Sequence, residues 1–270
     1  LEFRRVLFRS GVQNTGVGVR TLLTNVIGDH NVAVGYEAGV NCRDSDNVAV
    51  GYQSLYSGIH ANRCVAIGHS ALYTYNSSDT TAVGYRALYS ANLSSGNTAV
   101  GTQALELCDA DRNTAVGFHA LSSNTTGSDN VAVGWQSMYA NTNGYEGVAL
   151  GNQTLYSNTS GQRNTAIGHN VLRSNSTGND NCGVGWYALR VTTGSSNTAL
   201  GSAAGNAITS GTNNTVAGYG AGSSINTGAN NVCIGYTAGD NISSGTVNTC
   251  RSEEHTSELQ SQSTISYAVF

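Results

Sequence analysis

Residues 97–101 read Asn-Thr-Ala-Val-Gly, and residues 113–117 repeat the same five residues. With small changes the motif returns along most of the chain, each time 16 or 17 residues after the previous one. Its closing glycine occupies Gly18, Gly35, Gly51, Gly68, Gly84, Gly101, Gly117, Gly134, Gly151, Gly168, Gly185, Gly201, Gly218 and Gly235. A short fixed period of this kind is typical of a solenoid, in which each repeat adds one coil to a continuous stack.

The residues around each glycine predict the structure of one coil. Asn stands four residues before the glycine in most repeats, Ala usually stands two before it, and Val, Ile or Leu stands directly before it. This alternation with a period of two, rich in β-branched residues, predicts a short strand. Four residues after the glycine, Leu or Met in most repeats predicts a second short strand or a tight bend. Gly and clusters of Asn, Ser and Thr would form the corners.

These columns predict an all-β fold, a parallel β-solenoid or β-roll of about fourteen coils over residues 11–250. Coils stacked at a strand spacing of about 4.8 Å would form a rod roughly 65 Å long. Equivalent residues would then lie above one another. The Asn residues would form a ladder of amides, and the aromatic residues that follow many of the glycines would form a row of stacked rings.

The residue after the glycine is aromatic or His in ten repeats. Seven of these residues form a candidate surface-binding column: Tyr36, Tyr52, Tyr85, Trp135, Trp186, Tyr219 and Tyr236. An exposed row of this kind could stack on sugar rings. The favoured interpretation is that the row packs between coils or against a neighbouring chain.

Both ends of the sequence differ from the repeats. Residues 1–10 read LEFRRVLFRS, and residues 251–270 begin RSEEHTSELQS. Back-translated, the two stretches match opposite strands of a common short-read sequencing adapter. We therefore expect both ends to be translated adapter and not native protein. On this interpretation residues 11–250 are a piece of a longer protein, and a fifteenth repeat begins at Asn248.

Composition and motifs argue against several classes of function. The net charge is −4 and no basic patch is present, so nucleic acid is not an expected partner. No run of 18 apolar residues occurs, so a membrane would be reached only through regions outside this sequence. Lys is absent, which excludes a phosphate-binding P-loop. We find no catalytic constellation and expect no enzyme activity and no cofactor.

Metal binding is not predicted either. The Asp pairs Asp44/Asp46 and Asp109/Asp111 lie in turns and are interpreted as solvated charges, because the regular pattern of calcium-binding β-rolls is absent. His69 and His169 are six coils apart, which is roughly 29 Å, so they cannot share a metal. Cys233 and Cys250 occupy one column on adjacent coils. Burial as small apolar residues is favoured over a disulfide, because neighbouring strands point equivalent side chains in parallel.

A single coil is not stable by itself. Ordering each residue costs roughly 1–2 kcal/mol, whereas burying one Val, one Leu and one Ala returns only about 4–7 kcal/mol. Ala and Gly dominate the strand face opposite Val, and such small residues indicate close approach by another backbone. We therefore expect several chains to share a core, most simply as a parallel homotrimer.

The repeats of residues 11–250 carry a family resemblance. Residues 47–51 (NVAVG) and 63–68 (RCVAIG) resemble the head repeats of YadA-like trimeric autotransporter adhesins. Residues 97–105, in which NTAVG is followed by Gln-Ala-Leu, are also similar to repeats of phage tail-fibre-like proteins. The resemblance implies a homotrimeric rod on a cell surface, in the extracellular space or on a virion. Its partner would be a host receptor, a matrix protein or a glycan.

The leading functional prediction is therefore a structural and adhesive segment of a surface fibre. The alternative is a monomeric β-solenoid that binds polysaccharide or ice through a repeated surface column. An ice-binding face would need a Thr-x-Thr row, and that spacing is not kept from coil to coil. Trimerisation of the chain would separate the leading prediction from the alternative.

Overall fold

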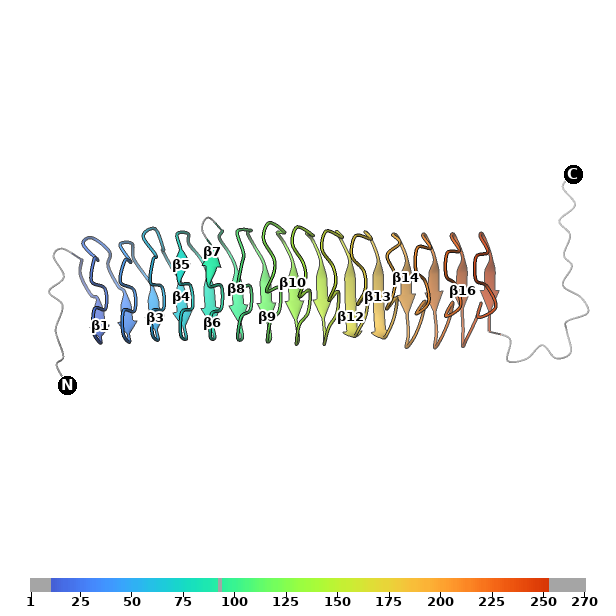
Figure 1. Ribbon diagram of the computed structural model, residues 1–270, viewed down its shortest axis with the longest axis horizontal. Coiled ribbons are helices and arrows are strands. Elements are labelled where there is room, and N and C mark those ends of the chain that lie inside the picture. The colour runs from blue at the N-terminus through green and yellow to red at the C-terminus, as the bar shows by residue number, and fades with distance from the viewer. Residues whose placement is uncertain (1–10, 92–93, 253–270) are drawn as a thin grey trace, which may run out of the picture.

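The computed structural model describes residues 11–91 and 94–252 of the 270 residues. These residues form a straight rod of stacked coils, drawn from blue to red in Figure 1. All regular structure within them is β, which confirms the predicted all-β parallel solenoid of 16–17-residue coils. Of the two predicted adapter-derived ends, residues 1–10 and 253–270 lie outside the described residues.

One parallel sheet of fifteen strands runs along the rod. Each strand comes from one coil and pairs in register with the strands of the coils before and after it, so that Ala115 lies beside Ala132 and Ala132 beside Ala149. The strands are β1 Thr15–Val17, β2 Val32–Val34, β3 Val48–Val50, β4 Val65–Ile67, β6 Thr81–Val83, β8 Thr98–Val100, β9 Thr114–Val116, β10 Val131–Val133, β11 Val148–Leu150, β12 Thr165–His169, β13 Cys182–Trp186, β14 Thr198–Leu200, β15 Thr215–Ala217, β16 Val232–Ile234 and β17 Thr249–Arg251.

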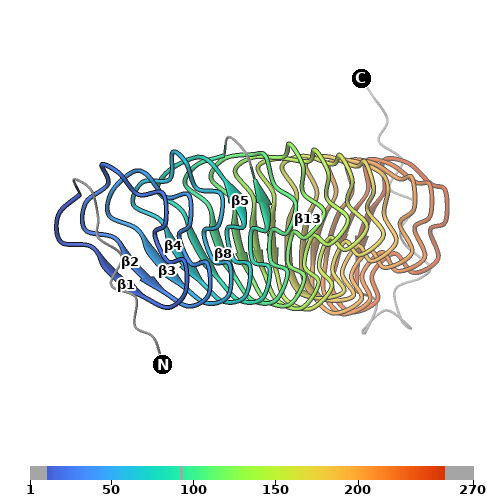
Figure 2. The same ribbon diagram turned by 60° about the vertical axis from the view of Figure 1, so that its left-hand side comes forward.

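The opposite wall of each coil is mostly a tight bend, the second of the two predicted forms. Figure 2 shows each coil as a flattened loop with two long walls. Among residues 11–91 and 94–252, only β5 (Thr74–Tyr75) and β7 (Ser90–Ala91) form a short sheet on the second wall. Elsewhere the column of Leu and Met residues adopts the left-handed backbone region, as at Leu105 with φ of 50°. Backbone bonds still join the coils there, since the amide of Leu105 donates to the carbonyl of Ala120 at 3.0 Å.

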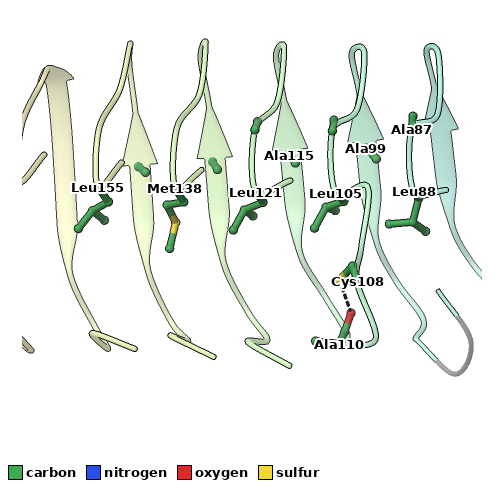
Figure 3. Packing of buried hydrophobic residues seen from close by; sticks show 14 of the residues in the cluster. Ala87, Leu88, Ala99, Leu105, Cys108, Ala110, Ala115, Leu121, Met138 and Leu155 are labelled. Carbon is green, nitrogen blue, oxygen red and sulfur yellow. Dashed lines mark hydrogen bonds between the residues drawn. The ribbon is translucent and has the colours of Figure 1, made fainter. Parts of the chain in front are cut away.

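The core lies between the two walls and consists of Ala from the sheet and Leu from the bends. Figure 3 shows Leu88, Leu105, Leu121, Met138 and Leu155 in one row, facing the row of strand alanines. The residues Ala99, Ala115, Leu105 and Leu121 are fully buried. This thin core is continuous along the rod, so each coil buries its apolar residues against the coils on both sides.

The prediction that Val belongs to this core was wrong. The residue before each glycine points outward, and Val34, Ile167 and Leu200 are 36%, 37% and 47% exposed. The small Ala column lies inside, covered by the Leu column of the same chain. The small residues therefore do not require a second chain, and the argument from a shared core no longer supports a trimer. We call the outward residues before the glycines the outer valine column.

The predicted amide ladder is confirmed in the interior. The side-chain oxygen Oδ1 of Asn113 accepts a hydrogen bond from the backbone N–H of Asn130 at 3.0 Å. Oδ1 of Asn130 in turn accepts from the backbone N–H of Gly147 at 2.9 Å. A second ladder runs through Asn124, Asn141, Asn158 and Asn175, with amide-to-amide bonds of 2.8 to 3.1 Å. Such ladders satisfy buried backbone groups at the corners, where regular strand pairing ends.

The six cysteines are free thiols. Cys233 and Cys250 are register partners on β16 and β17, as their shared column predicts. Cys42, Cys64, Cys108 and Cys233 are buried, and the thiol of Cys108 donates to the carbonyl of Ala110 at 3.4 Å (Figure 3). Burial raises the pKa of Cys42 and of Cys233 to about 12 and that of Cys64 to about 11.

We expect these four buried thiols to resist modification in the folded chain. At pH 8 only roughly one thiol in a thousand is ionised when its pKa is about 11, and the thiolate is the reactive form. Titration with a thiol-specific disulfide reagent should therefore label the partly exposed Cys182 and Cys250 first. The other four should react only after guanidinium is added. Rapid labelling of Cys64 in the native chain, located by mass spectrometry, would contradict the buried core.

Candidate binding surface

The aromatic residues after the glycines lie on the outside of the rod and stack along its axis. The rings of Tyr36 and Tyr52 have centroids 5.3 Å apart at an interplanar angle of 12°, and Tyr52 and His69 are 4.8 Å apart at 25°. Tyr219 and Tyr236 repeat this geometry at 5.4 Å and 11°. The row of stacked rings predicted from the repeat is therefore present. We call it the aromatic column.

The aromatic column is solvent-exposed, but within a run mainly the edges of its rings face solvent. The exposed fractions of its seven predicted members range from 43% at Tyr36 to 58% at Tyr219. A ring that is stacked on both sides, such as Tyr52, has its two faces covered by the rings above and below. Sugar rings stack on aromatic faces, so a continuous run of the column is a poor stacking surface for sugars. The column is thus exposed to solvent, as a binding surface would be, and its rings also pack against one another between coils.

The column is interrupted at Thr102, Asn152 and Ser202, which are 50 residues and three coils apart. Ion pairs between coils recur with nearly the same spacing. Arg63 contacts Asp79, Arg112 contacts Asp129 and Arg163 contacts Asp180, each at 2.6 Å. The guanidinium hydrogen bonds hold the pKa values of these three carboxyl groups below their ordinary range. This three-coil period was not predicted from the sequence, where only the period of one coil was identified.

A second row of aromatic rings lies beside the first and was also missed. Its members stand five residues after the glycine, and we call it the tyrosine column: Tyr56, Tyr73, Tyr89, Tyr139 and Tyr156. Tyr73 stacks on Tyr56 and on Tyr89, with centroids 5.0 Å apart in both pairs. The signal in the sequence was the recurring pair Leu-Tyr or Met-Tyr, in which the first residue enters the core and the second points outward.

Polar side chains fill the space between the two aromatic rows. They stand two residues after the glycine, and most are long, as at Gln53, Arg86 and Gln103. The amide of Gln53 donates to the carboxylate of Glu37 at 2.8 Å. Arg86 pairs with Glu106 at 2.9 Å, and its guanidinium lies 4.2 Å from the centroid of the Tyr89 ring. We call these residues the polar column.

The polar column has a gap at Ser70, and a depression of about 310 Å³ opens there. Ser70 is only 4% exposed and forms the floor. Gln53 and Arg86 lie on either side along the rod axis. Rings of the aromatic column and of the tyrosine column line the other two sides: His69, Tyr85, Tyr73 and Tyr89. We call this depression the Ser70 cup.

The side chains considered for metal binding lie apart from one another. His69 and His169 occupy the aromatic column, as their positions predicted, and His169 stacks near Trp186 at 6.5 Å. The turn carboxylates have basic neighbours, since Asp46 lies 3.2 Å from the ring of His30 and Asp111 lies 3.8 Å from the guanidinium of Arg112. Over the described residues, no three His, Cys, Asp or Glu side chains come together as a metal site would require.

The described part of the chain also contains no helix with the length and apolar character needed to span a bilayer. No family model matches the sequence, and the comparison with curated proteins finds no match. The surface itself is therefore the basis for a functional proposal. It consists of the outer valine column, the aromatic column, the tyrosine column and the Ser70 cup.

Proposed function

We propose that the chain is a structural and adhesive rod segment of a surface fibre and that three copies associate in parallel. The observation that carries the proposal is the outer face of the long sheet. From β1 to β16 the two outward residues on either side of the buried strand position are Thr, Val, Ile, Leu, Cys or Ala, and none is charged; His169 and Trp186, at the ends of the longer strands β12 and β13, belong to the aromatic column. The aromatic column lies beyond the ends of most strands, next to this strip and outside it, so it remains open to solvent when the strips meet. An uncharged apolar strip of this length is typical of a protein interface.

The size of the strip suits a stable contact between copies. Fourteen coils at about 4.8 Å and a width of four residues give roughly 65 Å by 13 Å, or about 850 Å². A standard protein interface buries about 800 Å² on each partner. Copies of the same repeat have the same rise per coil, so equivalent side chains can meet at every coil when the rods run side by side. A second copy of this chain is therefore the occupant that fits best.

A rod that carries the same surface columns on successive coils is suited to displaying binding groups at regular intervals. Its aromatic and tyrosine columns would present such groups to a host receptor, a matrix protein or a glycan. The family resemblance to trimeric adhesin heads and phage tail fibres supports the same role. A location on a cell surface, in the extracellular space or on a virion belongs to this proposal.

Light scattering on a sizing column tests the association. We expect the chain to elute with three times its own mass, and the double variant Ile67→Lys/Ile167→Lys to elute as a single chain. Both positions are in the outer valine column, 39% and 37% exposed, so lysine there adds charge without filling the core. Thr126→Lys, on an exposed turn, is the control and should keep the mass of the unsubstituted chain.

Other masses have clear meanings. If the unsubstituted chain is folded and elutes with the mass of one chain, the proposed association is wrong. A mass of two chains that the double variant abolishes would keep the contact face but reject three copies. Fusion to a trimerising coiled coil provides a second readout. If association is required for folding, the β signal in circular dichroism should be stronger in the fusion than in the chain alone.

A further inference from the structure

In the Ser70 cup, aromatic and hydrogen-bonding groups surround an open volume. Its volume of about 310 Å³ lies at the lower end of the range of small-molecule sites, which is roughly 300–1,000 Å³. A single sugar ring with part of its neighbour is of this size. Ser70 leaves the space open because its side chain is short. In other coils Gln103, His119 and Gln136 take the same position.

The polar groups of the cup match a ligand that carries hydroxyl groups. Arg86 lines the cup, and its Nε is buried without a hydrogen-bond partner among the described residues. The Arg86 side chain as a whole is 35% exposed, so other N–H groups of its guanidinium can donate to a hydroxyl group in the cup. Gln53 is held through its amide nitrogen by Glu37, which leaves its carbonyl oxygen as an acceptor. The hydroxyl of Ser70 lies 3.0 Å from Nδ1 of His69.

The charges around the cup balance. Arg86 pairs with Glu106, and Arg20 pairs with Glu37, so two positive groups face two negative ones. A cation would approach Arg86, and an anion would approach two carboxylates. Neither sign of charge is favoured. An uncharged ligand gives up the least hydration free energy when it enters the cup, so it fits best.

The aromatic walls add apolar contact to these polar groups. Tyr73 and Tyr89 turn their edges toward solvent because their faces are stacked on one another at 7°. Tyr85 is tilted by 44° against His69, so this pair is more open than the stacked pairs of Tyr36 with Tyr52 and of Tyr219 with Tyr236. A tyrosine hydroxyl is neutral at physiological pH, since its ordinary pKa is about 10, and partial burial raises the pKa of Tyr73 further. We propose that the Ser70 cup binds one neutral hexopyranose residue of a glycan.

This inference rests on the proposed attachment role and names the chemistry that it would recognise. Saturation-transfer NMR and calorimetry on the full chain test it with three probes: cellohexaose, maltohexaose and, as an acidic comparison, hexagalacturonate. We expect at least one neutral hexasaccharide to bind with a dissociation constant of about 0.1–10 mM, the weak range of a shallow single-ring site. Hexagalacturonate should bind less tightly.

Ser70→Gln should weaken this binding by about tenfold or more, because it refills the polar column. The variant should fold, since Gln53 has the same position in the preceding coil with a φ of 50°, close to the 56° of Ser70. Ala203→Gln makes a similar change in the same column eight coils away, with a φ of 57°, and should leave binding unchanged. Arg86→Lys keeps the charge, removes Nε and should also weaken binding.

Three results would overturn the proposal: no neutral hexasaccharide bound at about 10 mM, binding that Ser70→Gln leaves intact, or tighter binding of hexagalacturonate. The association of chains is measured separately by mass. A single chain that binds sugar would reject the trimer and keep the cup. A trimer that fails to bind sugar would keep the fibre and reject the cup.

Discussion

Replacing Gly117 with Ala is expected to destabilise the rod by roughly 3–5 kcal/mol, among the largest effects of any single methyl group in this chain. Gly117 closes the β9 repeat with a φ of 134°, in a backbone region that is essentially restricted to glycine. An added Cβ would lie 2.5 Å from the carbonyl oxygen of Gly134 in the next coil. That oxygen belongs to the backbone and cannot turn aside. The two coils would have to separate, which would break the hydrogen bonds between them.

The loss of stability from Gly117→Ala should first open the coils next to residue 117 and only then unfold the whole rod. In a solenoid each coil contacts only its neighbours, so opening between two coils exposes both without directly disturbing distant ones. Hydrogen exchange should therefore speed up most at the amides of β9 and β10, and thermal melting by circular dichroism should shift downward or broaden. Protection that stays unchanged at Val116 and Val133 would show that the column tolerates a side chain.

Gly96→Ala is the matched control. Gly96 has a positive φ of 68°, but the nearest atom to an added Cβ is Cγ of Arg112 at 3.6 Å. The equivalent position holds Arg63 with a φ of 54° and Asp79 with a φ of 59°. The left-handed region there is thus compatible with a side chain, and the substitution should cost only about 1 kcal/mol. The difference in the free energy of unfolding between the two variants gives the cost of the steric contact between coils, separated from the general cost of replacing a glycine.

The period of the sequence was sufficient to predict the stacking and the register. A glycine every 16 or 17 residues, with Asn and Ala at fixed distances before it, allows few arrangements other than one coil per repeat. The amide ladder and the stacked rings then follow from register alone. Which side of the strand faces inward did not follow. Val is more apolar than Ala, and the usual rule buries the larger apolar residue.

The structure reverses this rule because the coil is thin. The Leu column crosses most of the interior, as Leu105 does opposite Ala99 and Ala115 (Figure 3), and only a methyl group fits on the facing strand. Val at that position would overfill a closely packed core. Val216 and Val171 test this explanation within the chain. Val216 stands inside where its own coil has Gly222 in the Leu column, and Val171 faces Gly183. At these two places a larger residue on one wall faces a glycine on the other, so the fit depends on a relation between columns and not on a property of one column.

The tyrosine column and the Ser70 cup were beyond the sequence analysis for a different reason. The cup arises from the absence of a long side chain at one position in a column. Ser70 is unremarkable until its neighbours along the rod, Gln53 and Arg86, are known to be long and adjacent in space. Aligning the coils by their glycines places these residues together. Whether a gap is open or filled depends on side-chain directions, which the repeat does not specify.

Replacing Asn214 is expected to have the second large effect. Its amide nitrogen donates to Asn197 at 3.0 Å and to the carbonyl of Gly228 at 2.8 Å. Its carbonyl oxygen accepts from the backbone of Asn231 at 3.1 Å and from the Asn231 side chain at 3.0 Å. The residue is fully buried. Asn214→Ala leaves buried donors and acceptors without partners, each at a cost of about 1–3 kcal/mol, so a loss of roughly 3–5 kcal/mol is expected.

The control is Asn143→Ala, since Asn143 is exposed on a turn and should contribute less than about 0.5 kcal/mol. Urea unfolding followed by circular dichroism measures both variants. Equal midpoints for the two would show that the interior ladder does not hold the coils together. Asn is replaced naturally at Thr80, and there the buried hydroxyl of Tyr75 lies 2.5 Å from the Thr80 oxygen. A replacement within the ladder is thus accompanied by a new partner, which Asn214→Ala does not provide.

Asn214→Asp adds a dependence on pH with a defined sign. It keeps the size of the side chain but places an oxygen where the amide donated to Asn197 and Gly228. Burial and these facing oxygens would raise the folded-state pKa of the new carboxyl group above its unfolded value of about 3.9. A group whose pKa is raised on folding binds its proton more tightly in the folded state. The variant should therefore lose stability relative to the unsubstituted chain as pH rises from about 4 to 7, by up to about 1.4 kcal/mol per pH unit. A stability difference that stays constant between these pH values would mean that the ladder opens to solvent at this coil.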